Sequence, residues 1–239
     1  MDMRRDKDYR DFVIRKWVSG EIESFRKPSL KDLELMFPYY REIIEKYLPS
    51  LTKDASILEI GCGWGSFIYA LKRLGFYNIQ VIDIIKECCD FVKERFDTHV
   101  ENKDVFEFLR STNLKFNLII AFDVIEHFNK AEILELLHLI YENLEDQGVI
   151  LVRVPNGGSL KGFYIRYSGF IHEICFTELS INEIFKVIGF KEIKVFPEPY
   201  LSKNLLRKTI RKFINKALGK LFSLDFINSG NLIALAKKS

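Results

Sequence analysis

The sequence predicts a doubly wound α/β fold built on a mostly parallel, seven-stranded sheet. Strand and helix patterns alternate from residue 55 to residue 155, which is typical of βαβ units. The stretch FNLIIAF at 116–122 is apolar throughout, as expected of a strand buried on both faces of a parallel sheet. A glycine-rich turn, GCGWG at 61–65, follows the first apolar run and favours a ligand site after the first strand.

Each element follows from a local pattern. At the N-terminal side, residues 1–50 form a helical cap, in which FPYYREIIEKYLP at 37–49 predicts a helix bracketed by Pro38 and Pro49. Residues 51–239 form the main domain. Its predicted strands are residues 56–60, 78–84, 98–102, 116–122, 149–154, 191–196 and 231–238. Its predicted helices are residues 64–76, 86–96, 105–110, 130–144 and 177–190.

Capping residues support the last of these helices, because Thr177 is suited to the N-cap and Gly189 to the end. Glycines concentrate between 156 and 170, which predicts a loop that acts as a lid. Residues 197–229 form a helical insertion before the last strand. Its stretch 203–222 carries seven Lys and Arg residues and no acid, with an apolar stripe. That helix can dock on its own domain with a solvated basic face, or lie on an anionic membrane surface.

Composition narrows the class of protein. Hydrophobic residues make up 48% and charged residues 29% of the 239 residues, as in a globular soluble protein. The net charge of +3 is too small to predict a nucleic-acid partner. The N-terminus lacks the apolar segment of a secretory signal, and no apolar run is long enough to span a membrane. These features, with four cysteines that form no CxxC pair, favour a reducing cytoplasm and predict no metal site.

The glycine turn departs from the dinucleotide fingerprint GxGxxG. Counted from Gly61, its sixth position is Ser66, and the third glycine, Gly65, comes one residue early. Asp83 ends the second strand, where a carboxylate meets ribose hydroxyls in such folds. The pattern therefore predicts a nucleoside ligand without requiring a pyrophosphate.

With these residues, the chain resembles the class I S-adenosylmethionine-dependent methyltransferases over residues 55–196 and the last strand. Within that superfamily it is most similar to bacterial enzymes that methylate O-antigen, capsule and other glycans. The superfamily likeness is carried by ILEIGCGWGSF, VIDI, ENKDVFEFL, FNLIIAFDVIEHF and GVILVRVPN. The glycan likeness is carried by PYYREIIEKYLP, RVPNGG, IRYSGFIHEICFTELS and VIGF.

The resemblance implies a set of cofactor-binding residues for S-adenosylmethionine. Glu59 would hold the methionyl ammonium, and Gly61, Gly63 and Gly65 would form the close turn. Asp83 would bind both ribose hydroxyls. Several carboxylates are reasonable there, because the sulfonium is a cation and is costly to bury alone.

Further along the chain, the resemblance implies an adenine site and a methionyl site. Asp104 would accept a hydrogen bond from the adenine amino group, with Val105 or Phe106 against the ring. Phe122 and Asp123, at the end of the fourth predicted strand, would flank the methionyl part.

Histidines are the candidates for proton removal from an acceptor hydroxyl. His172, in the segment that would cover the acceptor, is the first candidate, and His127, after the fourth strand, is the second. Either histidine can instead be structural, with a hydrogen bond that holds its own loop in place. His99 and His138 lie away from the expected active edge of the sheet. The candidates for substrate binding are Arg153, Asn156, Arg166 and Tyr167. For Arg153, an ion pair to Glu173 or Asp123 is an equal alternative.

Taken together, the sequence predicts an S-adenosylmethionine-dependent methyltransferase that methylates a sugar hydroxyl of a glycan or glycan precursor in polysaccharide biosynthesis. The alternative within enzymes is an O- or N-methyltransferase of a small molecule, such as a quinone precursor or a nucleotide-linked sugar. The alternative of another class is a protein that binds the cofactor without turnover. The expected location is the cytoplasm. If the basic stretch 203–222 lies on a membrane, the protein would be peripheral at the inner membrane face.

Overall fold

We describe the protein from a computed structural model, which describes residues 15–16, 19, 26–168, 171–199 and 227–239. The basic stretch 203–222 and most of the insertion 197–229 lie outside the described residues, as do most of the first 25 residues. No helix in the described part is long and apolar enough to cross a membrane.

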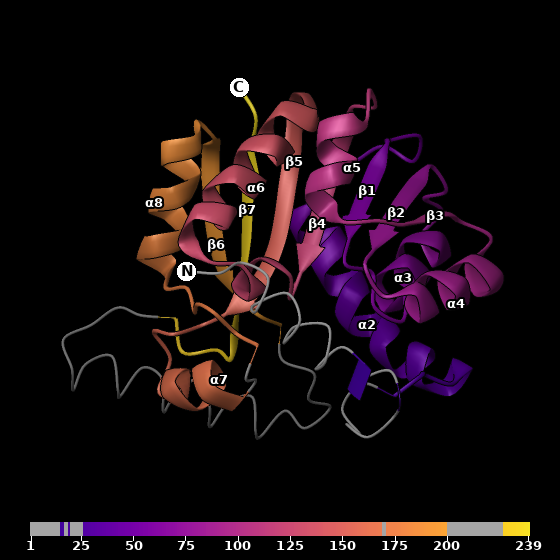
Figure 1. The fold of residues 1–239 in the computed structure, drawn as a ribbon, viewed down its shortest axis with the longest axis horizontal. Coiled ribbons are helices and arrows are strands. Elements are labelled where there is room, and N and C mark those ends of the chain that lie inside the picture. Colours follow the sequence, from indigo (N-terminus) through magenta and orange to yellow (C-terminus); the bar gives the residue numbers. More distant parts are fainter. Residues whose placement is uncertain (1–14, 17–18, 20–25, 169–170, 200–226) are drawn as a thin grey trace.

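A single seven-stranded sheet organises the chain, in the spatial order β3-β2-β1-β4-β5-β7-β6 (Figure 1). The first five strands along the chain run parallel, and β7 pairs antiparallel with both β5 and β6. The strand order reverses direction between β1 and β4, which makes a switch point at the carboxyl ends of these strands. The strands are β1 Ile57–Ile60, β2 Ile79–Asp83, β3 His99–Asn102, β4 Phe116–Phe122, β5 Leu144–Pro155, β6 Lys191–Pro197 and β7 Asn231–Lys237.

Helices cover both faces of the sheet, which confirms the doubly wound α/β prediction (Figure 1). Side chains alternate along β4: Leu118 and Ile120 pack into one hydrophobic cluster, and Ile119 and Ala121 into the other. Helices α2, α3 and α4 pack into the first cluster and α5, α6 and α8 into the second. The helices are α2 Leu30–Tyr47, α3 Ser66–Arg73, α4 Lys86–Phe96, α5 Val105–Ser111, α6 Lys130–Asn143, α7 Gly162–Ser168 and α8 Glu178–Ile188.

Helix α2 begins earlier than the sequence analysis predicted. Pro38 lies inside the helix and not at its start, because Ser29 and Asp32 form a capping box at Ser29, about two and a half turns before the proline. Tyr40, Ile43 and other side chains of α2 are buried in the cluster of α3 and β1. The helix therefore contributes to the core of the main domain.

Two other local predictions differ from the structure. The stretch 156–170, predicted as a loop, contains the short helix α7. Strand β5 starts at Leu144 rather than at Val149, because its first residues continue directly from α6 and Leu144 pairs with Phe116. The capping of α8 by Thr177 and its end at Gly189 are as predicted.

Candidate active site

One cavity of about 660 Å³ opens at the carboxyl ends of β1, β2, β4 and β5. This is the edge where open α/β sheets bind ligands. Most of the residues predicted for the cofactor line it, together with both candidate histidines. The lining includes Glu59, Gly61, Gly63, Asp83, Asp104, Val105, Phe122, Asp123, His127, Arg153 and His172.

The three glycines of the first turn have different roles. All three have positive φ, at +71° for Gly61, +48° for Gly63 and +73° for Gly65. A Cβ on Gly61 would lie 2.5 Å from Cγ2 of Val124, and one on Gly65 would lie 2.6 Å from Cε2 of Phe96. Gly65 does not line the cavity; its missing side chain makes room for α4. Only at Gly63 would an added Cβ meet open space, so this residue leaves room for a ligand.

The carboxylate of Asp83 is buried and held in place by the backbone. It accepts hydrogen bonds from Gly63 N at 2.9 Å and from Ile85 N at 2.8 Å. Burial raises the pKa of Asp83, and those two N–H groups oppose the rise. The glycine turn and the second strand are thus tied together by the side chain expected to bind ribose.

Glu59, at the centre of β1, is a buried acid with an unused oxygen. The residue is 3% exposed, and its Oε2 has no hydrogen-bond partner among the described residues. Burial, and then the charge of Asp83, raise the pKa of Glu59 well above its usual range. A buried carboxylate without a partner is costly, and a cation in the cavity would offset that cost.

Asp104 caps helix α5 at the other side of the cavity. One of its oxygens, Oδ1, accepts hydrogen bonds from Phe106 N at 2.9 Å and Glu107 N at 3.2 Å. No hydrogen bond to the other oxygen is present within the described residues. Val105 follows directly, is buried and lines the cavity. These two residues therefore lie where a ring with an exocyclic amino group could be bound.

At the end of β4, Asp123 forms an ion pair with Arg153 of β5. The guanidinium Nε donates to Asp123 Oδ1 at 2.9 Å, and Nη1 donates to the Tyr39 hydroxyl at 3.0 Å. Tyr39 in turn donates to Glu198 at 2.6 Å. Of the two alternatives for Arg153, the structure shows the ion pair with Asp123. Arg153 also lines the cavity, as Phe122 does.

The other predicted substrate residues lie away from the cavity lining. The buried amide of Asn156 donates to the carbonyls of Ile227 and Ser229, at 2.6 and 3.1 Å, which fixes the end of β5. Arg166, on α7, donates to the backbone carbonyls of His172 and Glu173. Tyr167, also on α7, is exposed, with Arg166 over its ring. In this structure these side chains support the loop, and a direct contact with substrate stays a prediction.

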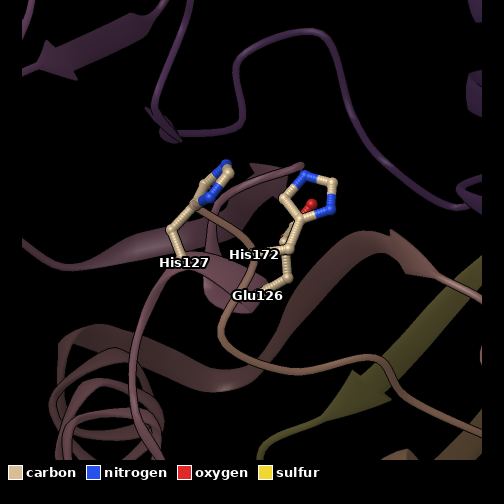
Figure 2. A group of neighbouring side chains, drawn as sticks. All are labelled: Glu126, His127 and His172. Atoms are coloured by element: carbon tan, nitrogen blue, oxygen red, sulfur yellow. The ribbon is translucent and has the colours of Figure 1, made fainter. Parts of the chain in front are cut away.

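Glu126, His127 and His172 converge at one side of the cavity (Figure 2). Glu126 and His127 lie in the short helix η2, Ile125–His127, and His172 lies in the segment after α7. The two imidazole centroids are 5.1 Å apart. Glu126 is 1% exposed, and its Oε2 has no hydrogen-bond partner in the described part of the chain. Both histidines were predicted as candidates from the sequence, whereas the position of Glu126 beside them is seen only in the folded chain.

Comparisons with known proteins now decide the family. The family model described as "Methyltransferase domain" matches residues 33–195, more than half of the chain. The chain belongs to this methyltransferase-domain family. No curated protein matches the chain.

Solved structures confirm the fold of the methyltransferase. This chain is similar to an S-adenosylmethionine-dependent methyltransferase from Archaeoglobus fulgidus, with 21% identity and a TM-score of 0.67. The match covers 84% of this chain and 94% of that one. It is also similar to the N-methyltransferase NodS from Bradyrhizobium japonicum in complex with S-adenosylhomocysteine, with 16% identity, a TM-score of 0.63 and 93% and 98% coverage. Magnesium protoporphyrin IX methyltransferase from Synechocystis matches with 12% identity, a TM-score of 0.63 and 96% and 100% coverage.

Tyr39 and Glu198 of the methyltransferase were not among the predicted site residues, although both contact Arg153 at the cavity. They come from α2 and from just beyond β6, and they meet Arg153 only through the fold. Tyr39 did lie in a quoted helical stretch, so its burial could be predicted. Nothing in the local pattern indicates that its hydroxyl lies between Arg153 and Glu198.

In the glycine turn of the methyltransferase, Gly61 is needed for packing and Gly63 leaves space for a ligand, and two substitutions can test this difference. Gly61→Ala should lower the free energy of unfolding by about 1–3 kcal/mol or more, because the new Cβ overlaps Val124 at a positive φ. Gly63→Ala should cost less stability, because its Cβ meets open space, but it should weaken ligand binding. Urea unfolding and calorimetric titration measure the two effects. Equal losses of stability in both variants would contradict the division of roles.

Proposed function

We propose that the chain is an S-adenosylmethionine-dependent methyltransferase that methylates a sugar hydroxyl in a glycan or glycan precursor. The observation that best supports this cofactor is the buried Glu59, which lines the same cavity as Asp83 and Gly63 and whose Oε2 has no hydrogen-bond partner among the described residues. These groups fit the ligand: Glu59 suits its ammonium, Asp83 its ribose hydroxyls, and Gly63 a close backbone approach. Asp104 and Val105 suit its adenine ring.

The bound cofactor supplies an activated methyl group. Transfer of that methyl group to the acceptor oxygen would leave the electron pair of the broken carbon–sulfur bond on sulfur. The hydroxyl proton has to leave as well, so a group beside the acceptor is needed. The protein's main tasks are to align the acceptor and to exclude water.

Glu126, His127 and His172 are the groups that we assign to this acceptor side. All three line the cavity, and His172 lies on the segment that follows α7. We place His172 before His127, because the Nδ1 of His127 lies 3.2 Å from the carbonyl oxygen of Ile171 and is used in bracing that segment.

The glycan acceptor rests on the resemblance of PYYREIIEKYLP, RVPNGG and IRYSGFIHEICFTELS to glycan methyltransferases. The location that we propose is the cytoplasm, with the basic stretch 203–222 as a contact to a membrane that carries a lipid-linked acceptor. A small-molecule O- or N-methyltransferase is the second candidate, and it is favoured by fold neighbours that are an N-methyltransferase and a porphyrin methyltransferase. A cofactor-binding protein without turnover is the candidate of another class.

Methyl transfer into cell extract separates these three candidates. With the methyl group of S-adenosylmethionine radiolabelled, label should appear in the polysaccharide or lipid-linked fraction. Label only in small molecules would favour the second candidate. Binding of the cofactor without transfer to any fraction would favour the third.

Asp83→Ala tests the cofactor site directly. It should weaken S-adenosylhomocysteine binding by about 1–3 kcal/mol, the range for leaving buried polar partners unpaired, and calorimetric titration measures this. Asp83→Asn preserves the shape and separates loss of charge from loss of loop support. Asp90→Ala, an exposed acid on α4, is the matched control and should leave binding unchanged. Tighter binding of NAD than of S-adenosylhomocysteine would contradict the assignment.

A further inference from the structure

The group of Glu126, His127 and His172 has the composition of a metal centre. Each residue offers one ligand atom, and these atoms all lie within 4.8 Å of one another (Figure 2). We propose that the three side chains bind a divalent transition-metal ion of the zinc class, which holds the acceptor hydroxyl. The use of the ion in methyl transfer rests on the proposed function, whereas its binding does not.

The buried carboxylate is the first argument for an ion. Glu126 is 1% exposed, and its Oε2 has no hydrogen-bond partner among the described residues. One of its carboxylate oxygens lies within 4.8 Å of a ring nitrogen of each histidine. Burial of a carboxylate oxygen is costly unless a cation or a donor satisfies it. A metal ion between Glu126 and the histidines would supply that partner.

His127 shows the orientation that metal-binding histidines usually have. Its Nδ1 lies 3.2 Å from the carbonyl oxygen of Ile171, and the carbonyl can only accept, so Nδ1 carries the proton. That tautomer leaves Nε2 with a lone pair for a metal. Histidine ligands in proteins commonly donate their other N–H to a carbonyl in this way.

The backbone that carries the ligands is already fixed. The amides of Glu173 and Ile174 donate to the carbonyl of Glu126, at 2.9 and 3.2 Å, which ties the His172 segment to η2. Arg166 binds the same segment from the other side through two backbone carbonyls. Metal–ligand bonds of about 2.0–2.1 Å set tetrahedral ligand atoms about 3.3 Å apart. From their present separation of at most 4.8 Å, the ligand atoms would have to approach one another by no more than about 1.5 Å.

The ligand set selects the kind of ion. Imidazole nitrogen suits Zn²⁺, Fe²⁺, Co²⁺ and Ni²⁺, whereas Mg²⁺ and Ca²⁺ prefer oxygen ligands. Three protein ligands leave a position open toward the cavity, as in catalytic His₂Glu zinc sites. A hydroxyl in that position would have a lowered pKa and would lose its proton to water, and its oxygen would then form the new bond to the methyl carbon.

Titration with Co²⁺ tests the site without cofactor or acceptor. The full-length protein, stripped with EDTA, should bind one Co²⁺ per chain with a visible absorption band and no thiolate charge-transfer band. His172→Ala and Glu126→Gln should each weaken binding about 10-fold or more. His138→Ala removes an exposed imidazole on α6 and should leave binding unchanged. A large excess of Mg²⁺ should not displace the ion.

Three results would overturn the proposal: no Co²⁺ binding by the wild type, unchanged affinity in His172→Ala, or a thiolate band that assigns the ion to cysteines. Circular dichroism and retained binding of S-adenosylhomocysteine show that each variant is folded. Because the readout is metal binding, a chain that binds Co²⁺ but transfers no methyl group would contradict only the proposed function. A chain that transfers methyl groups without binding Co²⁺ would contradict only the metal site.

Discussion

His172→Ala should lower kcat about 100-fold or more, while the affinity for S-adenosylhomocysteine stays nearly unchanged. A loss of this size is typical when a group that removes a proton from the nucleophile is deleted. Cofactor affinity should persist, because Glu59, Asp83 and Asp104 lie on other strands and helices of the cavity. Steady-state kinetics with radiolabelled cofactor and calorimetric titration measure the two quantities.

The same experiment separates a metal ion from a direct base. If an ion bound by His172 activates the acceptor, EDTA should lower kcat of the wild type to near the level of the variant, and Co²⁺ or Zn²⁺ should restore it. If the imidazole takes the proton directly, EDTA should have no effect on the wild type. His138→Ala is the control for loss of an imidazole elsewhere.

An opposite pattern would reverse the roles of the two histidines. Near wild-type turnover in His172→Ala, with turnover abolished in His127→Ala and the cofactor still bound, would make His127 the acting residue. Normal turnover in both variants would assign the proton to Glu126, Asp123 or solvent, and both histidines would then serve only to hold the loop.

How far the sequence could predict this molecule depends on the range of each interaction. The strands and most helices were predictable, because periodicity, capping residues such as Thr177 and the glycine turn act within a few residues. Pro38 misled the prediction of α2, since its local preference for a helix start is overridden by the capping box at Ser29 and by burial of the helix. The short helix α7 was missed because its glycines favour a loop.

The same difference between local and long-range interactions decides which residues of the site could be predicted. The positions of Asp83 and Asp104 could be predicted from the sequence because each lies at the end of a single element, β2 for Asp83 and the start of α5 for Asp104. Their roles toward the cofactor stay predictions. The meeting of Glu126 with His172 could not be predicted, because it depends on hydrogen bonds between η2 and a segment more than 40 residues away, such as Glu173 N to Glu126 O. The ion pair of Arg153 with Asp123 was predicted as an alternative, but its extension to Tyr39 and Glu198 needs the complete sheet.

Glu59→Gln should weaken binding of S-adenosylhomocysteine about 10- to 150-fold, the range of about 1.5–3 kcal/mol for a hydrogen bond to a charged group. The buried carboxylate is the partner that we assign to the ligand's ammonium, and an amide cannot supply its charge. The same substitution should raise the stability of the protein without ligand near pH 8. Calorimetric titration and urea unfolding at several pH values test the two effects.

The gain in stability follows from linkage between folding and protonation. Burial, and then the charge of Asp83, hold the pKa of Glu59 in the folded protein well above its value in the unfolded chain, which is about 4.3. Between these two pKa values the folded state binds more protons, so the free energy of unfolding falls as the pH rises. Glutamine does not titrate, so its advantage should shrink as the pH falls toward 4.3. Some pH dependence should remain in the variant, because burial also raises the pKa of Asp83. Equal binding by Glu59→Gln, or lower stability than the wild type at pH 8, would show that Glu59 is a structural acid rather than the partner of a cation.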